Sequence, residues 1–181
     1  MIRNIAVMAH VDTGKTTLTE QMLRHCGAIR AAGSVDAGTA HTDTLAVERR
    51  RGISVHAACV PMQWRDTKIN MIDTPGHTGF SAEVERSLWA LDGAVLLVSA
   101  VDGVMPQTEN LFRILHKLHL PTLLFINKTD RDGANPSAVL AQVRERLSPR
   151  VVEYTAEGLM ERLAETDENA LNDYLEGNTW P

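Results

Sequence analysis

The chain has few cysteines, no long apolar run and no excess of basic residues, and each shortage excludes a class of protein. Its two cysteines, Cys26 and Cys59, form no metal-like cluster, and we expect buried thiols in a reducing compartment. No apolar run approaches the roughly 20 residues that cross a bilayer. The net charge of −5 argues against a large basic surface that binds nucleic acid.

Internal repeats, low-complexity tracts and a signal-peptide pattern are also missing, and residues 1–5 lead directly into a predicted strand. The 181 residues, 44% of them hydrophobic, suffice for one domain with a sizeable core but are too few for two comfortable domains. We therefore expect a cytoplasmic monomer with no membrane and no DNA partner.

Four short motifs occur in a fixed order along the chain. Ala-His-Val-Asp-Thr-Gly-Lys-Thr occupies residues 9–16 and Arg-Gly-Ile-Ser residues 51–54. Asp-Thr-Pro-Gly-His follows at 73–77, and Asn-Lys-Thr-Asp at 127–130. Each motif falls at the carboxyl end of a predicted strand or in a loop expected to cover a nucleotide. Their order and context together predict a guanine-nucleotide switch.

Apolar runs alternate with amphipathic segments over residues 1–150. Strands are expected at residues 2–9, 53–64, 68–72, 93–101 and 122–126, and helices at 16–26, 81–91, 107–118 and from 135 onward. This alternation predicts parallel pairing with crossover helices, hence a three-layer α/β sandwich of the P-loop NTPase type with helices on both faces. Residues 1–150 would form the GTP-binding domain, and residues 151–181 an acidic, partly helical extension.

The first motif has the composition of a phosphate-binding loop. Gly14 permits close approach of the backbone, Lys15 would reach the β- and γ-phosphates, and the Thr16 hydroxyl would ligate Mg²⁺. Ala9 replaces the usual first glycine, which is acceptable if its φ stays negative. His10 receives only a loop-shaping role. The expected nucleotide-binding residues here are His10, Val11, Asp12, Thr13, Gly14, Lys15, Thr16 and Thr17.

The third motif carries the expected metal and water chemistry. Asp73 ends a strand and would lie near Mg²⁺, and the Gly76 N–H would face the γ-phosphate. A neutral His77 imidazole could orient the attacking water. A lone histidine is usually a satisfied surface or core residue, but His77 abuts Asp-Thr-Pro-Gly, which favours the catalytic interpretation.

The fourth motif predicts the base pocket. The Asp130 carboxylate can accept two N–H donors from guanine, and adenine offers no such pair. The Lys128 stem can lie against the purine, and Asn127 can brace the phosphate loop. Taken alone, this motif would fit an ordinary loop after a strand as well as it fits a base pocket.

The residues resemble the translational GTPases, and within them the ribosomal protection proteins that confer tetracycline resistance. The resemblance is carried by residues 9–20, by Gly-Ser-Val-Asp at 33–36 and by Glu-Arg-Arg-Arg-Gly-Ile at 48–53. Gln63-Trp64 with Thr67-Lys68 favours the protection proteins over elongation factor G. The similarity extends from residue 1 to about 150.

The resemblance implies further roles. Val11 and Ile53 match a hydrophobic gate that screens the catalytic histidine until the ribosome rearranges it, with large-subunit ribosomal RNA as the activator. Asp12 matches a position that holds a monovalent cation near the β–γ bridge. Ser54 falls where the family has its switch threonine, so it is expected to ligate Mg²⁺ with Thr16 and Asp73.

Two departures from the family pattern stand out. Gly79 replaces an aspartate that would cap a helix. A fifth motif, a Ser-Ala pair that contacts the guanine oxygen, should follow another strand and does not occur in this sequence. We therefore expect the last edge strand and helix of the fold to be missing.

Three functional hypotheses follow. The first is a GTPase: the N-terminal GTP-binding part of a protein that releases tetracycline from the ribosome, with very slow turnover alone. The second is another translational GTPase, resembling elongation factor G or a release factor of that class. The third is a truncated fragment that binds nucleotide weakly or serves only in interactions.

Overall fold

The computed structural model describes residues 1–29, 58–73, 88–154, 159–165, 171–172 and 175–176. The chain divides into two compact units, Met1–Leu140 and Ala141–Pro181. The predicted segments at 53–57 and 81–87 lie outside the described residues. Within the parts that are described, no helix has the length and apolar character to cross a membrane.

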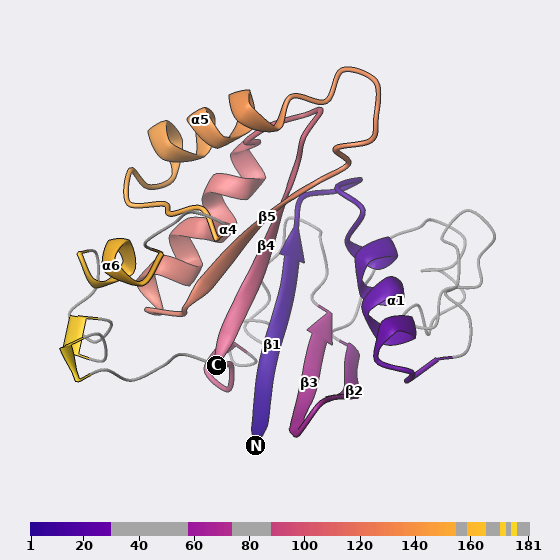
Figure 1. The fold of residues 1–181 in the computed structure, drawn as a ribbon. Helices are drawn as coiled ribbons and strands as arrows, with labels where there is room; N and C mark the ends of the chain where they lie inside the picture. The colour runs from indigo at the N-terminus through magenta and orange to yellow at the C-terminus, as the bar shows by residue number, and fades with distance from the viewer. Residues whose placement is uncertain (30–57, 74–87, 155–158, 166–170, 173–174, 177–181) are drawn as a thin grey trace. The chain divides into compact units, whose positions relative to one another are not determined.

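A sheet of five strands runs through the first unit (Figure 1). Across the sheet the strands are β2 (Ala58–Trp64), β3 (Thr67–Asp73), β1 (Ile2–Ala9), β4 (Gly93–Ser99) and β5 (Thr122–Asn127). All neighbours pair in parallel except β2, which is antiparallel to β3. Helix α1 (Lys15–His25) follows β1, and α4 (Pro106–Lys117) follows β4. The predicted mostly parallel α/β fold is confirmed.

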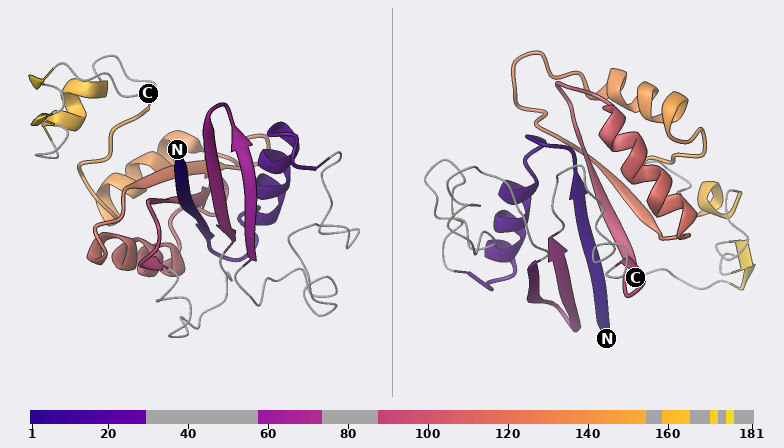
Figure 2. Two further views of the ribbon diagram at one scale, coloured as in Figure 1. Left: turned by 90° about the horizontal axis from the view of Figure 1, so that it is seen from below. Right: turned by 180° about the vertical axis from the view of Figure 1, so that it is seen from behind.

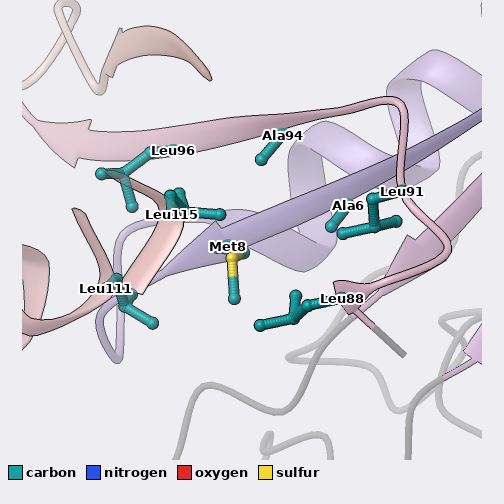
Figure 3. Packing of buried hydrophobic residues seen from close by; sticks show 8 residues of the cluster. All are labelled: Ala6, Met8, Leu88, Leu91, Ala94, Leu96, Leu111 and Leu115. Carbon is teal, nitrogen blue, oxygen red and sulfur yellow. The ribbon is translucent and has the colours of Figure 1, made fainter. Parts of the chain in front are cut away.

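Helices α1 and α4 cover opposite faces of this sheet (Figure 2). Successive residues of a strand point to opposite sides. Val7 therefore packs in the cluster that includes Leu23 of α1, whereas Met8 packs in the cluster that includes Leu111 and Leu115 of α4 (Figure 3). The second half of β1 and most of β4 are covered on both faces and are apolar in sequence, as central parallel strands usually are.

The β2–β3 hairpin differs by one residue from the sequence expectation. Its turn is Arg65-Asp66 alone, because Thr67 already pairs with Trp64. Arg65 has a φ of 49°, the left-handed conformation that two-residue hairpin turns need. On β2, Cys59 is exposed. The expectation of two buried thiols is therefore wrong for Cys59, whose side chain lies on the edge strand of the described sheet.

Strand β4 ends at Ser99, two residues before the predicted end at Val101. The Ser99 hydroxyl accepts hydrogen bonds from the backbone N–H of Val101 (3.3 Å) and of Asp102 (3.1 Å). The Gly103 N–H donates to the Ser99 carbonyl (2.9 Å). These bonds turn the chain at the carboxyl edge of the sheet and lead it into α4.

Helix α5 (Pro136–Arg146) begins as the sequence predicts, with Asn135 as its cap. The Asn135 Oδ1 accepts the Ala138 N–H at 3.0 Å, and proline fits the first turn because its missing N–H would have no partner there. The second unit contains the last turns of α5 and the short helix α6 (Leu159–Ala164). Within it, Arg144 donates to Glu153 at 3.0 Å.

Two leucines on neighbouring strands differ in burial. Leu96 of β4 is fully buried, whereas Leu123 of β5 is 51% exposed. We expect Leu96→Ala to lower the free energy of unfolding by about 2–5 kcal/mol, because it removes buried methyl groups and leaves a cavity. The matched control Leu123→Ala should change it by less than about 1 kcal/mol. Urea denaturation followed by circular dichroism checks both, and equal losses would contradict this account of the core.

Candidate functional site

The phosphate loop joins the carboxyl end of β1 to the start of α1. Ala9 is the last residue of β1 and pairs with Leu97, so it is extended and needs no glycine at this position. Left-handed backbone follows at Asp12 (φ 62°) and Gly14 (φ 91°). The Thr13 hydroxyl donates to the His10 carbonyl at 2.7 Å, which closes the turn between them. The result is a compact loop held against the first turn of α1.

Gly14 lies against Asn127, the last residue of β5. A Cβ at Gly14 would come within 2.7 Å of the Asn127 Nδ2, closer than non-bonded atoms tolerate. The same Asn127 amide donates to the Thr13 carbonyl at 2.9 Å. The first and fourth motifs, 114 residues apart at these positions, are thus in direct contact.

The remaining loop residues differ in exposure. Thr13 is buried and Lys15 and Thr16 are half-buried, whereas Val11, Asp12 and Thr17 are exposed. Lys15 and Thr16 lie in the first turn of α1, where backbone N–H groups have no helical partner and the helix dipole favours an anion. The residues predicted to bind phosphate are therefore gathered at one helix end.

The loop after β5 carries the residues predicted to bind the base. Lys128 has a φ of 60° and turns the chain, and the Arg131 N–H donates back to its carbonyl at 3.3 Å. The Asp130 side chain is exposed, so its carboxylate is available to a ligand. On the inner side, the Ala100 N–H donates to the Asn127 carbonyl at 2.8 Å, which fixes the loop to the end of β4.

The third motif is described only in its first residue. Asp73 ends β3, opposite Val7 of β1, at the same edge of the sheet as the phosphate loop. The other predicted catalytic and metal residues, Ile53, Ser54, Gly76 and His77, lie outside the described residues. No group of three His, Cys, Asp or Glu side chains able to hold a metal occurs among the residues that the structure describes.

A contact that sequence reasoning missed lies beside the phosphate loop. His10 is 8% exposed, and its Nε2 lies 3.9 Å from Asp102 Oδ2 in the turn after β4. Burial lowers the pKa of His10 below its usual value; Asp102 opposes this shift only in part, and Lys128 adds to it. Nothing local in the sequence pairs these two residues, which lie far apart in the chain.

A cavity of about 830 Å³ lies elsewhere in the first unit. It is lined by Gln21, Met22, Arg24, His25, Cys26, Met62, Trp64 and Ile69. These residues come from the carboxyl half of α1 and from the β2–β3 hairpin, whereas the motif residues lie at the amino end of α1. The cavity therefore lies apart from the predicted nucleotide site.

The described residues fit a nucleotide phosphate and a hard divalent cation. Gly14 supplies the left-handed backbone of this loop at a φ of 91°, a conformation that only glycine adopts readily and in which the loop N–H groups can face phosphate oxygens. Thr16 offers a hydroxyl oxygen, a ligand type that Mg²⁺ prefers. The loop follows the central strand β1, whose neighbours in the sheet are β3 on one side and β4 on the other. The chain therefore crosses over to strands on both sides of β1. Such switch points are where α/β sheets bind ligands.

Comparisons with known proteins agree with this geometry. The chain is 54% identical over 153 residues to an oxytetracycline resistance protein of Streptomyces rimosus, covering 84% of this chain and 23% of that protein. It is 54% identical over 151 residues to the tetracycline resistance protein TetM from transposon Tn1545 of Enterococcus faecalis, and this match covers 83% of this chain and 24% of that protein. It is 52% identical over 151 residues to the tetracycline resistance protein TetW of Butyrivibrio fibrisolvens, and this match covers 83% of this chain and 24% of that protein. The chain thus spans about a quarter of the length of these relatives.

A solved structure and a family model extend the match. A crystal structure of a protein from Thermus thermophilus superposes with a TM-score of 0.80 at 28% identity, covering 99% of this chain and 34% of that one. The family model for the elongation factor Tu GTP binding domain matches residues 1–177. The predicted relationship to the ribosomal protection proteins and the P-loop GTPase fold are both confirmed, and the chain belongs to the elongation factor Tu GTP-binding domain family.

Proposed function

We propose that this chain binds GTP and GDP through residues 10–17 and 127–130 and hydrolyses GTP slowly until a ribosome engages it. The hydrogen bond from Asn127 to the Thr13 carbonyl is the observation that supports this proposal most directly. It joins the loop suited to phosphates to the loop suited to the base, so one nucleotide can span both.

Each half of the nucleotide would be recognised by different chemistry. The backbone N–H groups beside Gly14, the Lys15 ammonium and the positive end of α1 would bind the phosphates. The Asp130 carboxylate would accept the N1 and exocyclic N–H groups of guanine. Adenine would leave this carboxylate without donors, which is the basis for discrimination.

Thr16, Ser54 and Asp73 would hold Mg²⁺, whose chemical contribution is neutralisation of charge developing on the phosphate oxygens. Asp12 would face a monovalent cation near the β–γ bridge. His77 would orient the attacking water, the Gly76 N–H would face the γ-phosphate, and Val11 and Ile53 would screen His77 before activation. All of these residues except Val11, Asp12, Thr16 and Asp73 lie outside the described residues.

The tetracycline resistance proteins named above suggest the biological setting. We propose that the chain acts as the GTP-binding domain, over residues 1–150, of a protein that releases tetracycline from the ribosome. Its activator would be large-subunit ribosomal RNA, met in the cytoplasm, and the chain would act as a monomer. GTP turnover would then be coupled to the ribosome rather than occurring freely.

Asn127→Ala removes the tie between the two loops. We expect the affinity for GDP to fall about tenfold, because one hydrogen bond that shapes the loop is lost. Isothermal calorimetry with Mg²⁺ and micromolar protein measures this. The matched control is Asn110→Ala on the exposed surface of α4, which should bind as the unaltered chain does. Absence of guanine-nucleotide binding by the unaltered chain would refute the proposed function.

Asp130→Asn tests base recognition. An amide offers one acceptor and one donor, which pair with the N1–H and the C2 carbonyl of xanthine. We expect GTP affinity to fall about 100-fold or more and xanthosine triphosphate to bind in its place. The control Asp132→Asn alters a nearby exposed carboxylate outside the motif. Competition of unlabelled nucleotides against fluorescent GDP gives the ranking, and unchanged preference for GTP would rule out this base pocket.

His77→Ala tests the proposed hydrolysis. Without ribosomes we expect turnover on the order of 10⁻⁴ to 10⁻² per second, which is typical of unassisted GTPases of this type. In the longer protein with ribosomes, the substitution should abolish stimulation while leaving GTP affinity unchanged. Phosphate release measured with and without ribosomes checks this. Fast turnover without ribosomes that survives His77→Ala would contradict the role.

A further inference from the structure

The contact between His10 and Asp102 has a role that neither the motifs nor the comparisons assign. We propose that His10 is a positioning residue: the Asp102 carboxylate holds its imidazole at Nε2, and this contact keeps the phosphate loop in its nucleotide-binding shape. The inference rests on the proposed nucleotide binding and adds a residue pair to it.

The backbone of His10 already closes the loop. Its carbonyl accepts the Thr13 hydroxyl at 2.7 Å and the Thr13 N–H at 3.4 Å. Asp12, within the turn that these bonds close, and Gly14, directly after it, have positive φ. Left-handed backbone at a residue other than glycine is costly and persists only where the surroundings hold it. The loop therefore depends on contacts that fix His10.

Asp102 is fixed independently of the phosphate loop. The Ser99 hydroxyl accepts its backbone N–H at 3.1 Å, and the next residue, Gly103, donates to the Ser99 carbonyl at 2.9 Å. Ser99 itself is fully buried at the end of β4. The backbone of Asp102 is thus held in this turn. Its side chain is 44% exposed, and its Oδ2 lies 3.9 Å from the His10 Nε2, an electrostatic contact that is longer than a hydrogen bond.

The buried imidazole is hard to explain as packing alone. His10 is more than nine-tenths buried, and its Nδ1 has no hydrogen-bond partner. Burying a polar atom without a partner is unfavourable, so an apolar side chain would fill the same space at lower cost. The nearby carboxylate favours the neutral tautomer with its proton on Nε2. What the imidazole gains at this position is the contact of Nε2 with Asp102.

The proposal distinguishes between the two ring nitrogens. A glutamine amide nitrogen reaches about as far as Nε2, whereas an asparagine amide nitrogen reaches only as far as Nδ1. His10→Gln should therefore keep the anchor and His10→Asn should lose it. Asp102→Asn should lose it as well, because the charge is removed.

Stopped-flow release of fluorescent GDP supplies the first measurement. We expect His10→Asn and Asp102→Asn each to raise the dissociation rate about tenfold, and the double substitution to raise it no further. His10→Gln should release GDP more slowly than His10→Asn, and the exposed hairpin control Asp66→Asn should release it at the unaltered rate. Equal rates for the Gln and Asn variants, or independent effects that multiply in the double variant, would overturn the proposal.

Amide hydrogen exchange without nucleotide supplies the second measurement. Exchange of the Thr13 N–H, which donates to the His10 carbonyl, should be several-fold faster in Asp102→Asn while the amides of β1 are unchanged. If the chain binds no nucleotide, the proposed function fails and this exchange alone decides the inference. An unchanged Thr13 rate would overturn it, and equal acceleration throughout β1 would show a merely structural role.

Discussion

The hydrogen bond from Asn127 to the Thr13 carbonyl is the constraint on which the arrangement of the site depends. The loop proposed to bind phosphate follows β1 and the loop proposed to bind the base follows β5, with β4 between them in the sheet. A side chain must therefore reach across the end of β4 to bring the loops together. Asn127 does so at 2.9 Å, and the Ala100 N–H ties its backbone to the end of β4.

The sheet makes this reach possible by holding its central strands rigidly. The carboxyl-terminal half of β1 and most of β4 are buried on both faces, by α1 on one side and α4 on the other. Interiors packed in this way deform little, so the ends of the strands are fixed points. The same carboxyl edge carries Asp73 at the end of β3 and Asp102 just beyond β4. Chemistry that needs several loops at defined separations can be built on such an edge.

Much of the fold could be predicted because its signals are local. The apolar run before residue 10 and the helices expected at 107–118 and from 135 onward each depend on neighbours in sequence. The ends of elements depend on more distant partners. Thr67 joined β3 because of its cross-strand partner Trp64, and β4 stopped at Ser99 because of a side-chain hydrogen bond.

The candidate site shows the same division. Residue types and order predict a phosphate loop and a base loop, since each motif has its candidate binding residues within a few positions of one another. The contact of His10 with Asp102 joins positions far apart in the chain, and nothing local in the sequence pairs them. The exposure of Cys59 was likewise missed, because the order of strands decides which one lies at an edge.

The close approach of Gly14 to Asn127 restricts how this sequence can drift. A Cβ at position 14 would meet the Asn127 amide at 2.7 Å, and the φ of 91° disfavours any side chain there. To accept such a side chain, the Asn127 amide would have to move, and this would break its hydrogen bond to the Thr13 carbonyl. A substitution in the first motif would therefore be felt in the fourth, although 114 residues separate the bonded pair.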